Sequence, residues 1–373
     1  MFQPGSLIGK PAENRTLIPP LTDLLPRLLP SLLTDELSEA TLQALEIDLL
    51  SDRRRMAAFG IEPGQARLVL LERLGLLRRA FPEVEAVWPH LMSNPTSPVW
   101  QILWQVWLPL ALSLAQRRQN QDRPFVQGVL GGQGTGKTTL AQMLALLLPH
   151  LGYRMVALSL DDLYLTYRDR LQLQQQDPRL IWRGPPGTHE VDLGIQVLDA
   201  LRQPTGAAIA LPRFDKSLHN GAGDRIAPEW VSPADIILFE GWFVGVRPVD
   251  PAVFDTAPEP ICTEADRQFA RDICDRLQAY LPLWQRLDSL MVLYPTDYRF
   301  SKQWRRQAEQ RMKAAGKPGM SDPEIDAFVD YFWQALHPDL FIRPLVTTPG
   351  WADLVIELDQ NHLPGRIYPS GEG

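Results

Sequence analysis

The chain has 373 residues, of which 45% are hydrophobic and 22% are charged, and this composition excludes disorder or a coiled coil as a description of the whole. At about 150 residues per domain, the length predicts two to three domains. The formal net charge of −7 offers no general electrostatic footprint for nucleic acid or an anionic membrane, so we expect neither as a partner.

Signals for secretion, membrane insertion or metal binding are weak. Cys262 and Cys274 lie in a helix-like stretch without a paired His, which fits neither a zinc site nor a disulfide framework, and we interpret them as packing residues in a reducing compartment. The longest apolar run, Val99 to Ala115, is too short to span a bilayer and predicts a buried helix. Glu13 and Asp23 come early for a transit peptide, so we expect a cytoplasmic protein.

The first part of the chain is predicted to be helical. Residues 1–30 are Pro-rich and aperiodic, but residues 38–58 place Leu side chains at helical spacing. Further apolar helices are predicted over residues 65–79 and 99–118. No recognisable chemistry lies here, and the apolar faces indicate core packing more than a partner surface. We therefore predict an all-helical N-terminal domain over residues 1–120.

After a polar stretch at residues 117–124, short apolar strands alternate with amphipathic helices, the pattern of an α/β fold. The strands are rich in Val, Ile and Leu, which indicates a mostly parallel, buried sheet in a second domain over residues 121–373. The predicted strands are Phe125–Leu130, Met155–Leu160, Asp235–Phe239, Leu290–Leu293 and Leu354–Leu358. The predicted helices are Lys137–Leu148, Leu193–Leu201, Glu264–Tyr280, Ser301–Ala315 and Asp322–Leu336.

The strongest motif lies between the first strand and the helix after it. The segment VQGVLGGQGTGKTTL fits G-x-x-x-x-G-K-[ST] in the strand, loop and helix context that this phosphate-binding loop requires. The glycines let backbone N–H groups approach phosphate oxygens, Lys137 can reach the β- and γ-phosphates, and Thr138 can ligate Mg²⁺. We expect the whole loop to bind the nucleotide: Gly131, Gly132, Gln133, Gly134, Thr135, Gly136, Lys137, Thr138 and Thr139.

Acidic residues follow two other strands. Asp161 and Asp162 end the second predicted strand, and Glu240 ends the third. Because ligands of open α/β sheets bind beyond the carboxyl ends of the strands, these acids are expected near the phosphate loop. Phosphoryl transfer needs a carboxylate at the attacking hydroxyl and acids around the metal, which favours Asp161 as the base and Glu240 beside the metal. The alternatives are a turn-capping role for Asp161 or Asp162 and a satisfied strand-end acid at Glu240.

The segment between these acids is too long and irregular for a simple crossover, and long ordered loops usually bind something. A small anionic substrate would explain the cations and His residues that gather there: Arg183, His189, Arg213, Lys216, His219 and Arg225. The alternative is a solvated loop with its own ion pairs, such as Asp215 with Lys216 and Asp224 with Arg225. The His residues lack the spacing of metal ligands, so we expect them to form hydrogen bonds.

A basic helix near the C-terminus is the last candidate. It gathers five cations within thirteen residues: Arg305, Arg306, Arg311, Lys313 and Lys317. One interpretation is a mobile lid that brings Arg305 and Arg306 to the nucleotide and the transferring phosphoryl group. The other is an ordinary solvated helix face.

Six segments in this order resemble the D-glycerate 3-kinases of plants and cyanobacteria: GGQGTGKTT, LSLDDLYLT, RGPPGTHEVDL, LPRFDKSLHNGAGDR, LFEGWFVG and QWRRQAEQRMKAAGKPGMSDPEIDAFV. That family belongs with the uridine kinases, pantothenate kinases and phosphoribulokinases, and the likeness covers roughly residues 99–360. The resemblance implies conversion of D-glycerate to 3-phosphoglycerate with ATP and Mg²⁺, a step of photorespiratory salvage in photosynthetic cells. One departure is Leu163, where many relatives have Phe.

The resemblance also implies roles for individual residues. Asp161 matches the base of the uridine kinases, and Glu240 matches the acid near the metal. His219 falls where uridine kinases carry a substrate-contacting His. The segment LSLDDLYLT adds Asp162 and Tyr164 as expected substrate contacts.

We therefore predict a P-loop α/β kinase that transfers the γ-phosphoryl group of ATP in line to D-glycerate. A pentulose phosphate, a nucleoside or pantothenate is the alternative substrate. A P-loop switch or assembly ATPase is a more distant alternative, because the sequence has neither N-K-x-D nor L-S-G-G-Q. The sequence makes no prediction of oligomeric state.

Overall fold

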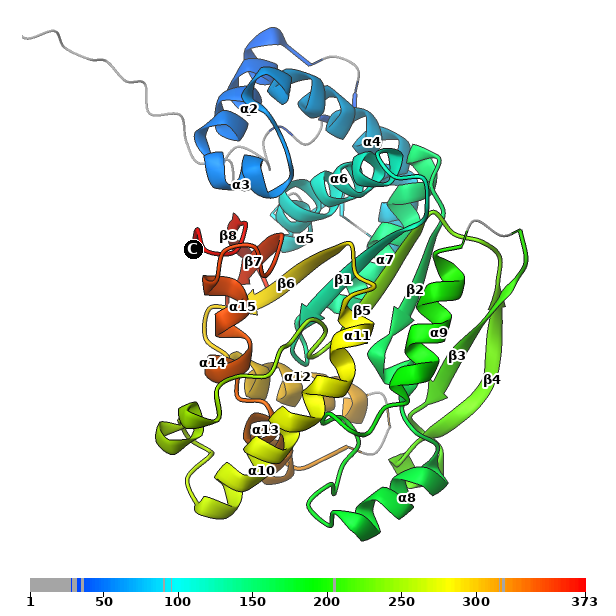
Figure 1. Cartoon of the computed structure of the whole chain (residues 1–373). Helices are drawn as coiled ribbons and strands as arrows, with labels where there is room; N and C mark the ends of the chain where they lie inside the picture. The colour runs from blue at the N-terminus through cyan, green and yellow to red at the C-terminus, as the bar shows by residue number, and fades with distance from the viewer. Residues whose placement is uncertain are drawn as a thin grey trace, which may run out of the picture.

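The computed structural model describes residues 28, 32–34, 37–89, 91–94, 96–203, 206–314, 316 and 319–373. The stretch 1–30, predicted to be aperiodic, lies outside the described residues except for Leu28, and Lys317 of the predicted basic helix also lies outside them. Figure 1 shows the N-terminal helices, in blue and cyan, at one end of the molecule. They are α2 (Glu39–Ser51), α3 (Arg53–Ala58), α4 (Ala66–Val87), α5 (Pro98–Ile102), the π-helical turn η2 (Leu103–Trp107) and α6 (Leu108–Gln119).

The N-terminal helices differ from the prediction at their ends. The predicted helix 38–58 is divided at Asp52, whose side chain accepts the Arg55 N–H and so begins α3 as a cap. The helix predicted to end at Arg79 continues as α4 across Pro82. Among the described residues one helix, Pro98–Gln119, is long and apolar enough to cross a membrane, and 67% of its most apolar window is buried within the protein. The prediction of a buried helix here is confirmed, but the prediction that the run is too short to span a bilayer is wrong, because the helix extends beyond the apolar run to 22 residues.

A six-stranded sheet forms the centre of the molecule, in the order β2-β5-β1-β6-β7-β8. The first five of these strands are parallel, and β8 pairs with β7 in the antiparallel direction. All five predicted strands are present, and the predicted α/β fold with a mostly parallel sheet is confirmed. The strands are β1 (Phe125–Gly131), β2 (Met155–Ser159), β5 (Ile236–Gly241), β6 (Ser289–Pro295), β7 (Leu354–Leu358) and β8 (Pro364–Tyr368).

Helices cover both faces of the sheet, and side chains alternate between two apolar cores. One core joins the N-terminal helices and α7 to Val129, Leu238, Met291 and Ile356 of the sheet. The other joins α9, α10 and α13 to Leu130, Phe239, Val292 and Val355. Full burial of each such side chain contributes about 1.5–3 kcal/mol. Because one core runs from the N-terminal helices into the sheet, these helices support one face of it, while the division at residue 120 stays a prediction.

The remaining helices include all five that were predicted. They are α7 (Lys137–Leu147), α8 (Tyr167–Gln176), α9 (Val191–Leu201), α10 (Glu264–Arg276), α11 (Leu281–Trp284), α12 (Phe300–Ala314), α13 (Asp322–Ala335), α14 (Pro338–Phe341) and α15 (Arg343–Thr347). Short 3₁₀ turns are η1 (Pro63–Gln65), η3 (Leu148–Leu151), η4 (Leu160–Leu163), η5 (His219–Gly221), η6 (Pro251–Thr256) and η7 (Leu277–Tyr280).

The segment between Asp161 and Glu240 is more regular than predicted. Besides α8 and α9 it contains an antiparallel hairpin of β3 (Ile209–Asp215) and β4 (Asp224–Val231). Helix α8 has no buried residue, and β4 is mostly exposed, so neither shows the apolar periodicity that reveals an element in a sequence. A register shift between Leu211 and Arg213 further interrupts the alternation in β3.

The parallel register places the predicted site at one edge of the sheet. Glu240 in β5 lies opposite Val129 in β1 on one side and opposite Ser159 in β2 on the other. The phosphate loop follows β1, and Asp161 follows β2, so all three features lie at the carboxyl ends of neighbouring strands.

Candidate active site

The phosphate loop runs from the end of β1 into the first turn of α7. Gly134 and Gly136 have φ angles of 80° and 87°, in the left-handed region that favours glycine. A Cβ atom at Gly131 would collide with Thr135 Oγ1, and one at Gly134 would lie 2.7 Å from the Trp304 side chain. The glycines therefore let the backbone close tightly around the N-terminus of α7, where free N–H groups attract anions.

Lys137 lies at the base of this loop with only 15% of its side chain exposed. Its Nζ donates hydrogen bonds to the carbonyl oxygens of Gly131 at 2.7 Å and Gly132 at 3.1 Å. The same nitrogen is 4.0 Å from Glu240 Oε2. Burial lowers the pKa of Lys137, while the carboxylates of Glu240 and Asp161 oppose that shift. The ammonium thus lies between the loop and the strand-end acids, as the motif predicts.

The oxygen atoms around Lys137 fit a magnesium ion. Thr138 is exposed on the first turn of α7, and the Glu240 carboxylate faces Lys137 from the end of β5. Gln133 Oε1 is buried and has no hydrogen-bond partner among the described residues. No group of three or more His, Cys, Asp and Glu side chains that could hold a metal occurs in the described part of the chain. The Thr138 hydroxyl and the Glu240 carboxylate are oxygen donors, the kind of ligand that Mg²⁺ prefers beside phosphate and water.

Asp161 follows β2 in the turn η4 and contacts two other predicted residues. Its Oδ2 lies 2.6 Å from Lys216 Nζ, and its backbone carbonyl accepts the Tyr164 N–H at 3.4 Å. Burial alone would raise the pKa of Asp161, but the Lys216 ammonium and the nearby Tyr164 side chain reverse the shift and hold that pKa below its ordinary value. Asp161 is therefore a charged acceptor at the strand ends, as a base for a hydroxyl requires.

Asp162 has a different environment from its neighbour. Its Oδ2 accepts the Ser159 N–H at 3.1 Å and pairs with Arg213 Nη1 at 2.8 Å, and its Oδ1 accepts the Phe214 N–H at 3.3 Å. Burial raises the pKa of Asp162, and these hydrogen bonds partly oppose the rise. The carboxylate caps η4 and joins this turn to β3, as in the capping alternative given above, and its predicted contact with substrate stays a prediction.

The three arginines predicted to bind substrate differ in their partners. Arg213 pairs with Asp162 and with Glu229 at 2.8 Å, and Arg225 pairs with Glu190 at 2.5 Å. Arg183 has no carboxylate partner among the described residues, and its Nη1 donates to the carbonyl oxygens of Gly221 at 2.6 Å and Ala222 at 3.0 Å. Its guanidinium carbon lies 5.9 Å from the Tyr164 ring centroid and 5.6 Å from that of Phe214. Arg183 is the one of the three whose charge is not neutralised.

His189 is buried directly behind Tyr164. The two rings stack with centroids 4.6 Å apart, and an isolated antiparallel bridge joins the two backbones. His189 Nδ1 lies 2.8 Å from the Tyr280 hydroxyl, which also accepts the Gly187 N–H at 2.9 Å. Burial lowers the pKa of His189 to about 3, against an opposing effect of Asp161. His189 is therefore a neutral imidazole over the whole range in which a kinase works.

His219 lies in the turn of the β3–β4 hairpin with a φ of 51°. Its ring stacks on Tyr167 at 4.0 Å, and its Nε2 is 3.1 Å from Asp224 Oδ2. Arg170 and Arg183 hold the same turn through the carbonyls of residues 221–223. The structure thus connects His219 to the turn that Arg183 holds, and its predicted contact with substrate stays a prediction.

Two cations of the predicted lid pair with carboxylates of α12 and α13. Arg305 pairs with Glu309 one turn along α12, and Arg306 pairs with Asp326 of α13 at 2.6 Å. Trp304 of α12 reaches the phosphate loop, and its Cβ packs on Gly134. The carboxylates therefore hold Arg305 and Arg306 in this structure, and the predicted contact of both with the nucleotide stays a prediction.

The turn between β7 and β8 also contacts the phosphate loop. His362 Nε2 donates to the Gly134 carbonyl at 2.8 Å, and its ring stacks on Trp304 at 4.3 Å. Trp304 Nε1 donates to the Gln360 carbonyl at 2.9 Å. Segments from the middle and the end of the chain thus meet at Gly134.

Comparison with known proteins places this arrangement in a family. No protein-family model matches the chain. The chloroplastic D-glycerate 3-kinase of Arabidopsis thaliana is 33% identical over 255 residues, which are 65% of this chain and 54% of that protein, so the chain spans about half of its length. The uncharacterized kinase mug58 of Schizosaccharomyces pombe is 32% identical over 59% of this chain and 82% of its own.

A solved structure agrees with these sequence relatives. The D-glycerate 3-kinase of Cryptococcus neoformans superposes with a TM-score of 0.59 at 28% identity, covering 69% of this chain and 96% of that chain. The chain belongs to the P-loop kinase family that includes D-glycerate 3-kinase. The family resemblance given by the six sequence segments is confirmed.

Within this family fold, sequence reasoning missed several residues that shape the site. Tyr280 holds His189, Glu190 neutralises Arg225, and Arg170 shares the hairpin turn with Arg183. Tyr280 falls in a helical stretch where an aromatic residue is expected to be core. The sequence contains only a weak indication of Glu190 and Arg170, because Glu190 lies within a segment that resembles the family and Arg170 lies close to one.

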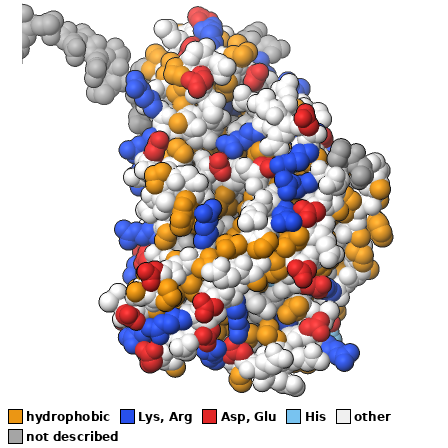
Figure 2. Space-filling view, viewed as in Figure 1, with side chains coloured by type: hydrophobic (Ala, Val, Ile, Leu, Met, Phe, Trp, Pro, Cys, Tyr) orange, Lys and Arg blue, Asp and Glu red, His pale blue; other side chains and the backbone are white. Residues whose placement is uncertain are grey.

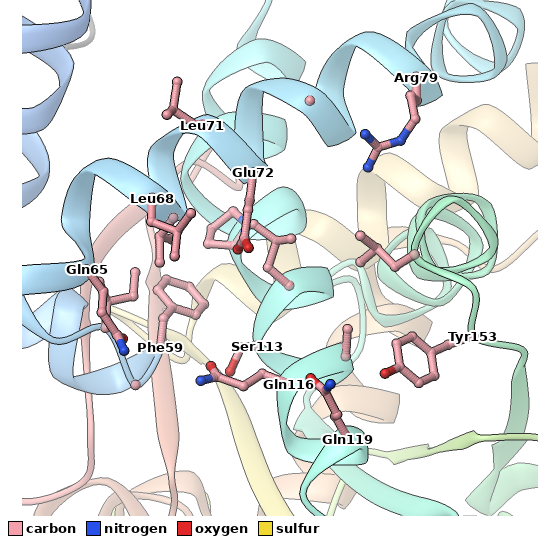
Figure 3. A pocket seen from close by; sticks show the side chains of 18 residues that line it. Phe59, Gln65, Leu68, Leu71, Glu72, Arg79, Ser113, Gln116, Gln119 and Tyr153 are labelled. Atoms are coloured by element: carbon pink, nitrogen blue, oxygen red, sulfur yellow. The ribbon is translucent and has the colours of Figure 1, made fainter.

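A large groove lies away from this site. A groove of about 690 Å³ lies between α4 and α6 and is closed at one side by residues after α7. Figure 3 shows Leu68 and Glu72 of α4 opposite Ser113 and Gln116 of α6, with Tyr153 at the far end. A smaller apolar cavity of about 70 Å³ adjoins Gly132 and Gln133 and is lined by aromatic side chains of α13.

Proposed function

We propose that the chain transfers the γ-phosphoryl group of ATP to the 3-hydroxyl of D-glycerate. The proposal rests on one observation above all. An ionised Asp161, a buried Lys137 and an arginine without a carboxylate partner, Arg183, lie around the carboxyl ends of neighbouring strands. The relatives named D-glycerate 3-kinase in Arabidopsis and Cryptococcus support the choice of substrate.

In the proposed reaction, Asp161 accepts a hydrogen bond from the 3-hydroxyl and receives its proton as the new bond to phosphorus forms. The bond between the γ-phosphorus and the bridging oxygen breaks, and ADP leaves. Lys216 fixes the Asp161 carboxylate by its ion pair at 2.6 Å, so the acceptor oxygen is oriented before substrate arrives.

On the other side of the transferred group, Lys137 exchanges its contacts with the Gly131 and Gly132 carbonyls for oxygens of the β- and γ-phosphates. Thr138 and Glu240 are the residues that would hold Mg²⁺. When bound, this ion neutralises negative charge that develops on the phosphate oxygens. Backbone N–H groups of the loop and the N-terminus of α7 stabilise the same charge without moving.

Arg183 is the residue proposed to bind the glycerate carboxylate. The planar guanidinium fork matches two carboxylate oxygens, and its position above the Tyr164 ring keeps it near Asp161. Arg213 and Arg225 already have carboxylate partners and would have to give them up to bind substrate.

The proposal is tested by measuring ADP release in a coupled assay with D-glycerate, ribulose 5-phosphate, uridine and pantothenate as acceptors. We expect turnover with D-glycerate that exceeds turnover with each of the others. Turnover of another acceptor without turnover of D-glycerate would support a kinase activity but contradict D-glycerate as the substrate. ATP hydrolysis that no acceptor stimulates would favour a P-loop switch instead.

A further inference from the structure

The structure leaves one buried donor without a partner in the middle of the site. His189 is 5% exposed, and its Nε2 has no hydrogen-bond partner among the described residues. Buried polar groups in native proteins are nearly always paired, because an unpaired one is costly. The other ring nitrogen of the same side chain is paired with Tyr280. The free-energy cost of leaving Nε2 without a hydrogen bond therefore indicates that a ligand pairs with it.

The hydrogen bonds of Tyr280 decide which nitrogen of His189 carries the proton. The Tyr280 hydroxyl accepts the Gly187 N–H at 2.9 Å, so one of its lone pairs is used. Its single proton needs an acceptor, and His189 Nδ1 at 2.8 Å is the acceptor that the described residues supply. A hydroxyl that donates to Nδ1 requires the tautomer with hydrogen on Nε2.

The position of His189 connects this N–H to the reacting group. Its ring lies against Tyr164 at 4.6 Å, and the Tyr164 backbone N–H donates to the Asp161 carbonyl at 3.4 Å. Phe243 packs on the His189 ring from another side at 5.5 Å, which fixes its plane. The donor is thus held rigidly one side chain away from Asp161.

We propose that Tyr280 is a positioning residue that fixes His189 as the Nε2–H tautomer, and that this N–H donates to an oxygen of the substrate held beside Asp161. The inference rests on the proposed function and deepens it, because it names a second group that binds glycerate besides Arg183. A neutral N–H donor differs from a cation in being directional, because its hydrogen bond forms only with a hydroxyl or carboxylate oxygen that lies along the N–H bond.

The tautomer can be measured without any substrate. Long-range ¹H–¹⁵N correlation spectra of the whole chain labelled at His report which ring nitrogen is protonated, and the His189→Gln variant identifies the signals of His189. We expect the Nε2–H tautomer at pH 7 in the wild type and its loss in Tyr280→Phe. The control is Tyr368→Phe, which removes the hydroxyl of an equally buried tyrosine in β8 that donates to Glu357 of β7 at 2.9 Å. An Nδ1–H tautomer or an imidazolium in the wild type would overturn the assignment of Tyr280.

The contact with substrate is measured by kinetics. His189→Leu removes the donor, and we expect it to raise the glycerate KM about ten-fold with the ATP KM unchanged. His189→Gln keeps an N–H donor and is expected to recover part of that loss. Tyr280→Phe is expected to raise the glycerate KM in the same direction while Tyr368→Phe does not, which separates positioning from a general loss of stability.

An unchanged glycerate KM in folded His189→Leu and Tyr280→Phe would overturn the contact even if the tautomer is correct. Failure of the proposed function gives a different result, because wild-type protein would then not turn over glycerate at all. In that case the substrate contact is rejected with the function, while the spectra still decide the role of Tyr280.

Discussion

The groove between α4 and α6 and the cluster at the strand ends differ in chemistry. The groove has an open volume of about 690 Å³, but Arg79 and Glu72 are its charged lining residues and both are exposed. The strand ends instead gather Lys137, Asp161 and Glu240 within reach of one another, and the side chains of Lys137 and Glu240 are each only 15% exposed. A large open volume therefore does not by itself locate the chemistry of this fold, whereas buried charges do.

The largest effect is expected from Lys137→Ala. It removes the ammonium at the phosphate loop, and we expect a fall in turnover of about 10³-fold or more with the fold intact. Steady-state kinetics and thermal unfolding measure the two properties. The control Lys302→Ala removes an ammonium that pairs with Asp330 on the surface of α12. If the two variants lost equal activity, the loss in Lys137→Ala could not be attributed to the position of its ammonium at the strand ends.

Asp161→Asn and Asp162→Asn separate chemistry from architecture within one dipeptide. We expect Asp161→Asn to lower turnover by about 10² to 10⁴, the range of a general base, with ATP binding nearly unchanged. Asp162→Asn weakens the pair with Arg213 and is expected to destabilise the fold by about 1–3 kcal/mol with a smaller loss of turnover. The reverse order would assign the base to Asp162.

Arg183→Ala is expected to raise the glycerate KM by about 30-fold, the low end for loss of a charge partner, because the side chain is only partly buried. The ATP KM is expected to stay unchanged. Arg213→Ala is the matched control, since it removes an arginine of the same segment that is already paired, and it is expected to change stability more than KM. Equal effects on KM would show that the carboxylate is bound elsewhere.

Lys216→Met tests the electrostatics of Asp161. In the wild type the pKa of Asp161 lies below its ordinary value, so the base is ionised at every pH above that pKa and activity is lost only as the pH falls through it. Without Lys216, burial dominates and raises this pKa, so the acid limb of kcat/KM moves to higher pH. The exposed Lys313→Met serves as the control. If the acid limb of kcat/KM did not move, Lys216 would not be the group that lowers the pKa of Asp161.

The smallest effect is expected in the groove. Leu68 is 59% exposed on α4, and we expect Leu68→Ser to change the free energy of unfolding by about 0.5 kcal/mol or less. Turnover and both KM values are expected to stay within a factor of about two, as for surface substitutions away from a site. A ten-fold change in any of them would show that the N-terminal helices influence the strand ends.

The elements that sequence reasoning predicted are those with local signals. The phosphate loop is a contiguous motif, and parallel topology brings the residues after β2 and β5 to its side without further information. Ion-pair partners could not be predicted in this way, because each pair joins residues from segments that are distant in the sequence. Lys216 was considered with Asp215 but pairs with Asp161, and Arg225 was considered with Asp224 but pairs with Glu190.

This failure has a physical reason. Successive side chains in a strand point to opposite faces, so Asp224 and Arg225 of β4 are poorly placed to pair with one another, and Lys216 lies in the turn just after β3. The contact of Tyr280 with His189 spans 91 positions and leaves no periodic trace. The hairpin was missed for a related reason, since a largely exposed two-stranded sheet has no buried face to impose alternation.

The contact of His362 with Gly134 has a consequence for the order of assembly. The two residues are 228 positions apart. Because synthesis runs from the N-terminus, the phosphate loop leaves the ribosome before Trp304 and His362 are made, so the hydrogen bond and the stacked rings at Gly134 form only after both residues have been added. A nascent chain that ends before His362 would therefore carry the whole nucleotide motif without these contacts.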